Sequence, residues 1–126
     1  MKLRSSRDVI IRTDAWDKAI EFYSSILNLA VTHRGQTLMG FDTGAFRLYV
    51  EKGAPHGPVF DFLVPDIPAA KLALVAAGCA VLEENPRIPR CYMADPFGLV
   101  FNLGQAPKKR PTSAKPIRRR SSSRGR

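Results

Sequence analysis

Residues 8–33 read DVIIRTDAWDKAIEFYSSILNLAVTH and place two patterns one after the other. The run Asp8–Thr13 is rich in β-formers and predicts a strand. The apolar residues after it are spaced three and four apart, as on one face of a helix. They are Trp16, Ala19, Ile20, Tyr23, Ile26 and Leu27. Asp14 is the predicted N-terminal cap of this helix and Asn28 its C-terminal cap.

Short β-rich runs separated by Gly-containing turns follow the helix. The predicted strands are Leu29–His33, Thr37–Asp42 and Ala45–Glu51. Lys52–Pro58 then interrupts the chain with Gly and Pro, and the succession starts again. A strand at Val59–Val64 precedes a second helix, which Asp66 caps and Gly78 ends. The remaining predicted strands are Ala80–Glu83, Arg90–Ala94 and Leu99–Leu103.

The two halves also match in detail. Leu29-Ala30-Val31 after the first helix corresponds to Cys79-Ala80-Val81 after the second, and each half closes on a turn led by an aspartate, Asp42 or Asp95. One half exposes an apolar sheet face, so two halves are needed to close a core. The repeat predicts an α+β fold of two βαβββ modules, about residues 8–52 and 58–104. We expect them to form a cleft-shaped mixed sheet with the helices on its outer faces.

The positive charge is confined to one end of the chain. Residues 1–105 hold eleven Lys or Arg and eleven Asp or Glu, whereas residues 106–126 hold nine Lys or Arg and no acid, which accounts for the net charge of +9. The segment 106–126 is also rich in Ser and Pro and has too little apolar surface to fold. We therefore predict one domain over residues 1–105 and a disordered basic tail.

Cysteine usage and hydropathy indicate a cytoplasmic protein. Cys79 and Cys91 make neither a disulfide framework nor a CxxC pair, and both are expected to act as small hydrophobic residues. The polar N-terminus has no apolar signal segment, and no run is long enough to span a membrane. No membrane partner is expected.

Two motifs resemble the vicinal oxygen chelate superfamily. Val9-Ile10-Ile11, followed by Ala19-Ile20-Glu21-Phe22-Tyr23 and Leu27-Asn28-Leu29, resembles its opening motif. Asp95-Pro96-Phe97-Gly98-Leu99-Val100-Phe101-Asn102-Leu103 resembles its closing motif, and the resemblance covers about residues 8–104. The superfamily includes glyoxalase I, extradiol dioxygenases, fosfomycin-modifying enzymes and metal-free antibiotic-sequestering proteins. The resemblance also implies a homodimer.

Metal-dependent members of this superfamily supply His, Gln or Glu from one inward position on each of four strands. By this resemblance the four positions fall on Asp8, Arg47, about Val59, and Asn102. Arg47 cannot coordinate a metal and would repel it, Val59 has no donor atom, and Asn102 is a weak ligand. We therefore expect no metal and no other cofactor, and the sequence leaves open whether the protein is an enzyme.

Strand alternation predicts the other residues that face the cleft. With the positions above, the predicted ligand-binding residues are Arg47, Tyr49, Asp61, Asp8, Arg12 and Asn102. Arg47 is the expected principal contact, which favours a neutral, anionic or mixed-charge ligand over a bleomycin-like cation. The alternative to ligand binding is a purely structural role, in which Arg47 forms an internal ion pair with Asp61 or Asp8. His33 and His56 are expected to be exposed residues away from the site.

Three functions follow from these observations. The first is a metal-free, bleomycin-resistance-like protein that binds a small molecule. The second is a metal-dependent enzyme of glyoxalase or dioxygenase type with non-standard ligands, such as Asp8, Asp61 and Glu51. The third is a scaffold whose tail, through Lys108–Arg110 and Arg118–Arg120, binds nucleic acid or an anionic surface, although such charge runs are more often solvated.

Overall fold

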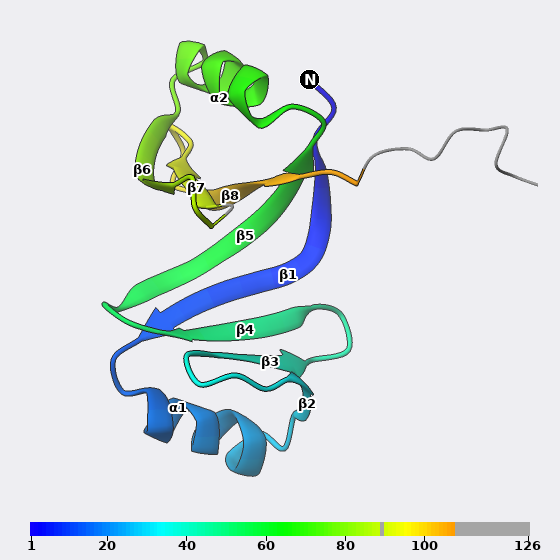
Figure 1. Ribbon diagram of the computed structural model, residues 1–126, viewed down its shortest axis with the longest axis vertical. Coiled ribbons are helices and arrows are strands. Elements are labelled where there is room, and N and C mark those ends of the chain that lie inside the picture. The colour runs from blue at the N-terminus through cyan, green and yellow to red at the C-terminus, as the bar shows by residue number, and fades with distance from the viewer. Residues whose placement is uncertain (89, 108–126) are drawn as a thin grey trace, which may run out of the picture.

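The computed structural model describes residues 1–88 and 90–107, which form one mixed eight-stranded sheet and two α-helices. The helices lie at opposite ends of the molecule, with the sheet between them (Figure 1). The strands are β1 (Arg4–Thr13), β2 (Ala30–His33), β3 (Leu38–Asp42), β4 (Arg47–Lys52), β5 (His56–Val64), β6 (Ala80–Asn85), β7 (Arg90–Ala94) and β8 (Val100–Gln105). The predicted fold class is confirmed.

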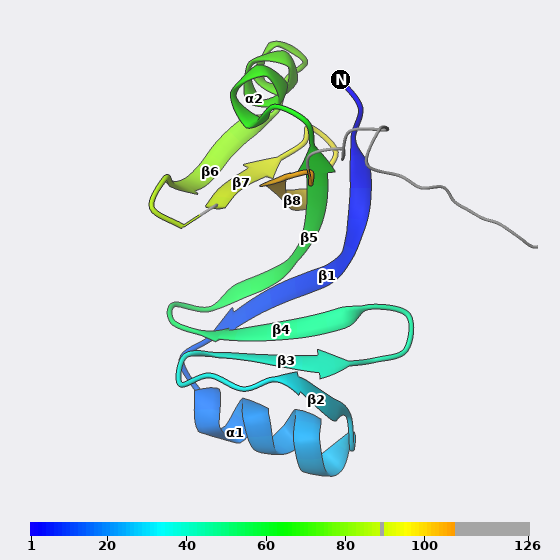
Figure 2. The ribbon, with the colours of Figure 1, turned by 45° about the vertical axis from the view of Figure 1, so that its right-hand side comes forward.

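The strand order is β2-β3-β4-β1-β5-β8-β7-β6. Within each half, the first strand pairs in parallel with the last, β1 with β4 and β5 with β8. The halves join through the antiparallel pair of β1 and β5, the two long strands at the centre of Figure 2. Within the described residues β2 and β6 are not paired with each other, so the sheet is an open trough.

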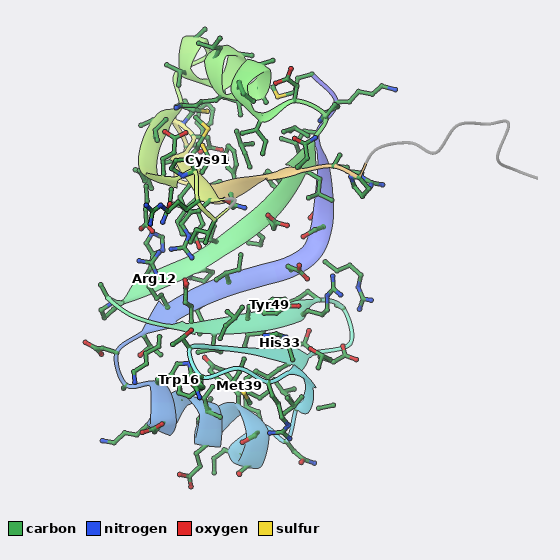
Figure 3. The ribbon with its side chains drawn as sticks, in the orientation of Figure 1. Arg12, Trp16, His33, Met39, Tyr49 and Cys91 are labelled. Carbon is green, nitrogen blue, oxygen red and sulfur yellow. The ribbon has the colours of Figure 1, made fainter. Side chains whose placement is uncertain are left out.

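Each half has its own apolar core between its helix and the outer face of its strands. In the first half, Met39, Phe41 and Val50 are buried, and Trp16 and Tyr23 pack on them from the first helix (Figure 3). The buried core of the second half comprises Val64, Ala70, Cys91, Met93, Phe101 and Leu103. Burial of these side chains is the main force that holds each helix on its sheet.

The first helix starts later than the sequence predicts. Helix α1 (Trp16–Glu21) continues as a π-helical segment, η1 (Phe22–Ile26). Its N-terminal cap is Ala15, without a side-chain hydrogen bond, so the prediction that Asp14 caps the helix is wrong. The hydroxyl of Thr13 accepts the Ala15 N–H instead, at 3.1 Å. This local turn places Asp14 one residue outside the capping position.

The other helix ends agree with the predictions. Asn28 adopts φ 56°, and the Leu29 N–H donates to the Tyr23 carbonyl at 3.0 Å, which closes the first helix. Helix α2 (Ile67–Ala76) is capped by Asp66, whose Oδ1 accepts the Ala69 N–H at 3.1 Å.

The predicted tail begins at the end of the described chain. The Ala106 N–H still donates to the Val64 carbonyl, at 2.8 Å. Residues 108–126, which carry the basic charge, lie outside the described residues. Within the described part of the chain, no helix is long and apolar enough to cross a membrane.

Candidate ligand-binding cleft

The trough encloses a cavity of about 550 Å³ on the face opposite the helices. Alternation along the strands separates the two faces, since Ile10 lines the cavity whereas Ile11 packs on the first core. The first half contributes Asp8, Ile10, His33, Leu38, Tyr49 and Glu51 to the cavity wall. The second half contributes Asp61, Arg90, Tyr92, Asn102, Gly104 and Gln105.

Asp8 and Arg47 form an ion pair at the first of the two parallel strand pairs. They are register partners on β1 and β4, and the Arg47 Nε donates to the Asp8 Oδ1 at 2.7 Å. Asp8 lines the cavity, but Arg47 does not, and 43% of the Arg47 side chain is exposed. The residue expected to be the principal ligand contact is therefore paired with a cavity residue but does not itself line the cavity.

Asp61 and Asn102 form the corresponding pair in the second half. They are register partners on β5 and β8, and the Asn102 Nδ2 donates to the Asp61 Oδ1 at 2.9 Å. The Cys91 N–H donates to the Asn102 Oδ1 at 2.8 Å, which fixes the orientation of this amide. Asn102 is only 7% exposed, so both of its polar groups are used by the protein.

The two pairs correct one assignment made from the sequence. The counterpart of Asp8 in the second half is Asp61, not Val59, which is buried at 1% exposure and does not line the cavity. Asp8 lies eight positions before the start of α1 at Trp16, whereas Asp61 lies only six before the start of α2 at Ile67. The spacing of the first half, counted back from Ile67, therefore gives Val59 and misses Asp61 by two residues.

The four family positions do not fit a metal ion. Arg47 brings a positive charge, and the only oxygen of the Asn102 amide already accepts a backbone hydrogen bond. The alternative set of Asp8, Asp61 and Glu51 does not converge either, since no group of three His, Cys, Asp or Glu in residues 1–88 and 90–107 could hold a metal. Each of these carboxylates accepts a hydrogen bond from a different side chain: Asp8 from Arg47, Asp61 from Asn102 and Glu51 from Arg90.

Arginines and glutamates from both halves form a quartet at one end of the cleft, composed of Arg12, Glu51, Glu83 and Arg90. The Arg12 Nη2 donates to Glu83 at 3.0 and 3.1 Å, and the Arg90 Nη1 donates to Glu83 Oε2 at 3.0 Å. The Arg90 Nη2 donates to both oxygens of Glu51 at 2.8 Å. Arg12 was expected to face a ligand, but its guanidinium belongs to this quartet.

Tyr92 lies beneath the quartet. The Arg12 and Arg90 guanidinium carbons lie 5.8 and 5.1 Å from the centre of its ring, and Tyr92 is only 3% exposed. Burial works against the charged form of Glu83, but hydrogen bonds from Arg12 and Arg90 outweigh it and lower the Glu83 pKa. The quartet is therefore a charged, mutually neutralised wall of the cleft.

Two aromatic rings of the first half, those of His33 on β2 and Tyr49 on β4, lie side by side in the cavity wall. The His33 and Tyr49 ring centres are 6.4 Å apart, and both residues line the cavity (Figure 3). His33 is exposed, as predicted, but the prediction that it lies away from the site is wrong. A Cβ at Gly40 would lie 2.9 Å from the Tyr49 Cε1 and 3.2 Å from the His33 Cβ, so a glycine is needed there. A glycine inside a strand was the available sequence signal for this close approach.

Sequence reasoning did not find the contribution of β7. Cys91 is buried in the second core, so Arg90 and Tyr92 on either side of it face the cleft. Applying strand alternation to residues 90–94 would have identified both. His56, expected to be an exposed loop residue, lies on β5 with its ring centre 5.6 Å from that of Tyr92.

Comparison with known proteins agrees with this architecture. Among solved structures, the chain is similar to a hypothetical protein from Bacillus halodurans C-125 (TM-score 0.61, 10% identity, 89% of this chain and 100% of that chain). It is also similar to a glyoxalase/bleomycin resistance protein/dioxygenase superfamily member from Vibrio splendidus 12B01 (TM-score 0.57, 16% identity, 83% and 100%). An extradiol ring-cleaving dioxygenase from B. fuscum matches over 82% of this chain but only 33% of its own length (TM-score 0.58, 14% identity).

At these identities the structural matches establish the fold alone. No curated protein matches the sequence. The family model of the glyoxalase-like domain matches residues 8–104, which is most of the chain and includes both modules. The protein therefore belongs to the glyoxalase-like domain family.

Proposed function

We propose that the protein binds a small organic molecule in the cleft and does so without a metal ion. The observation that supports this is the state of the four family positions, which are hydrogen-bonded to one another in two pairs, Asp8 with Arg47 and Asp61 with Asn102. The cavity of about 550 Å³ is of the size usual for small-molecule sites, and Ile10, Leu38 and the aromatic rings give it apolar walls.

The proposed contacts follow from the cavity wall. Tyr49 offers an aromatic face and a hydroxyl, and Asp8, Asp61 and Asn102 form the polar floor. Arg47 acts through Asp8, which it orients, and Arg12 acts in the same way through Glu51 and Glu83. The homodimer expected from the resemblance stays a prediction, which sedimentation equilibrium of the full chain would test.

A thermal-shift screen of a compound library tests the proposal. A ligand that binds only the native state raises the melting temperature, and the shift should be lost in Tyr49→Ala, which removes one wall of the cleft. Phe97→Ala is the matched control, because Phe97 is 93% exposed in a turn outside the cavity. Hits whose shifts survive Tyr49→Ala would contradict the assignment of the site. Stoichiometric metal in the purified protein would contradict metal-free binding.

A further inference from the structure

The charges around the cleft do not balance. Within the part of the chain that the structure describes, the cavity wall and its ion-pair partners contain four carboxylates, Asp8, Glu51, Asp61 and Glu83, and three guanidiniums, Arg12, Arg47 and Arg90. Arg47 pairs with Asp8, and the quartet neutralises Glu51 and Glu83.

The surplus negative charge lies on Asp61. No ion pair within the described residues includes Asp61, and its hydrogen bond there comes from the neutral Asn102 amide. Because Asn102 is held by the Cys91 N–H, the amide fixes Oδ1 of Asp61 and leaves Oδ2 without a hydrogen bond from the described residues. The carboxylate is thus oriented by the protein but not neutralised by it.

The surroundings of Asp61 leave room for a ligand group. A Cβ at Gly104 would lie 3.3 Å from the Asp61 Oδ1 and 3.0 Å from the Leu63 Cδ2, so this glycine keeps the floor beside the carboxylate open. The Tyr49 ring lines the same cavity. Aromatic faces attract cations and apolar rings alike. The Tyr92 ring is not available in this way, because it is 3% exposed and already lies under the Arg12 and Arg90 guanidiniums.

We propose that the ligand is a protonated amine on an aromatic or compact apolar body, with its nitrogen bound by Asp61. This inference rests on the proposed function and specifies the ligand class of the same cleft. It differs from the expectation of a neutral, anionic or mixed-charge ligand, because that expectation took Arg47 as the principal contact, and Arg47 does not line the cavity. A charge-assisted hydrogen bond to an oriented carboxylate is stronger than a neutral one, so charge should dominate ligand choice.

Matched probes separate charge from shape. The library consists of sets in which one aromatic body carries an amine, a hydroxyl or a carboxylate, for example 3-phenylpropylamine, 3-phenylpropan-1-ol and 3-phenylpropanoate. Calorimetric titration should give the amines at least about tenfold tighter binding than the alcohols, with the carboxylates weakest. Raising the salt concentration should weaken the amines and leave the alcohols unchanged.

Two variants assign the preference to one residue. Asp61→Asn keeps an oxygen to accept from Asn102 but removes the charge, and should lower amine affinity to the level of the alcohols. Arg47→Ala leaves Asp8 without its ion-pair partner in the cavity wall and should strengthen the preference for amines. Phe97→Ala, which lies outside the cavity, should leave the order of the three classes unchanged. Carboxylates that bind most tightly, with a preference lost in Arg47→Ala, would overturn the inference and leave the proposed function standing. A library with no hit at all would overturn both.

Discussion

Arg90 donates two hydrogen bonds of 2.8 Å to Glu51 across the full width of the cleft. These residues lie on β7 and β4, which are separated in the sheet by β8, β5 and β1. Arg12 on β1 likewise reaches Glu83 on β6, across three intervening strands. The sheet must curve for these side chains to meet. The quartet therefore couples the closure of one end of the cleft to the relative position of the two halves.

Loss of one quartet member should destabilise the fold measurably. Glu83→Gln removes one of the two negative charges that pair with Arg12 and Arg90, and should lower the free energy of unfolding by about 1–2 kcal/mol. The expected loss in the free energy of unfolding is smaller than for a fully buried ion pair, because the Glu83 side chain is 36% exposed. Urea unfolding measures it.

Glu84→Gln is the matched control on the same strand, because the one ion pair of Glu84 among residues 1–88 and 90–107 is with Lys71 at the surface. This variant should cost less than about 0.5 kcal/mol. Equal losses in the two variants would show that the quartet contributes no more than a surface pair.

The contribution of the Glu83 charge to the free energy of unfolding should disappear in acid. Hydrogen bonds from the arginines lower its pKa in the folded protein below the ordinary value of 4.5. A carboxyl with a lowered folded pKa stabilises the fold above the unfolded pKa, and the stabilisation is lost as the pH falls through the folded pKa. The stability difference between wild type and Glu83→Gln should therefore be constant from pH 7 to about 5 and shrink below the ordinary value. Urea titrations at stepped pH would reveal a pH-independent difference if the pKa is not the cause.

The two aspartates assigned as helix caps should behave differently. Asp66→Ala removes the acceptor of the Ala69 N–H and should cost about 1 kcal/mol. Asp14→Ala should change stability by less than about 0.5 kcal/mol, since Asp14 is exposed and does not cap α1. Paired thermal or urea unfolding of the two variants provides the measurement. A comparable loss in Asp14→Ala would mean that Asp14 stabilises the helix start in solution.

Local patterns predicted the elements well because each depends on nearby residues. The apolar stripe from Trp16 to Tyr23 and the caps at Asn28 and Asp66 act within a few residues, and the structure agrees with them. The assignment of Val59 failed because the two halves differ by two residues between the cleft position and the start of the helix.

Local sequence patterns could not predict the ion pairs of the quartet. Its members lie up to 78 positions apart, from Arg12 to Arg90, and they meet only because the sheet curves. Strand alternation indicates which face a side chain occupies, but it does not indicate which opposite charge neutralises it. For this reason the sequence identified Asp8, Tyr49, Asp61 and Asn102 as cleft residues and misjudged the charge of the cleft.

The Asn102 amide should be essential because it serves two different groups. Asn102→Ala leaves the buried Cys91 N–H without its acceptor and should cost about 1–3 kcal/mol at every pH. Asn102→Asp keeps an acceptor for this N–H but places a second carboxylate beside Asp61, whose Oδ1 now lies 2.9 Å from the amide nitrogen. Repulsion should make this variant unstable near neutral pH, and the deficit relative to wild type should shrink in acid, once one of the two carboxyls is protonated. Urea unfolding of both variants at pH 7 and pH 4 separates the effects. A deficit of Asn102→Asp that does not change with pH would show that the amide acts through packing and not through the charge of Asp61.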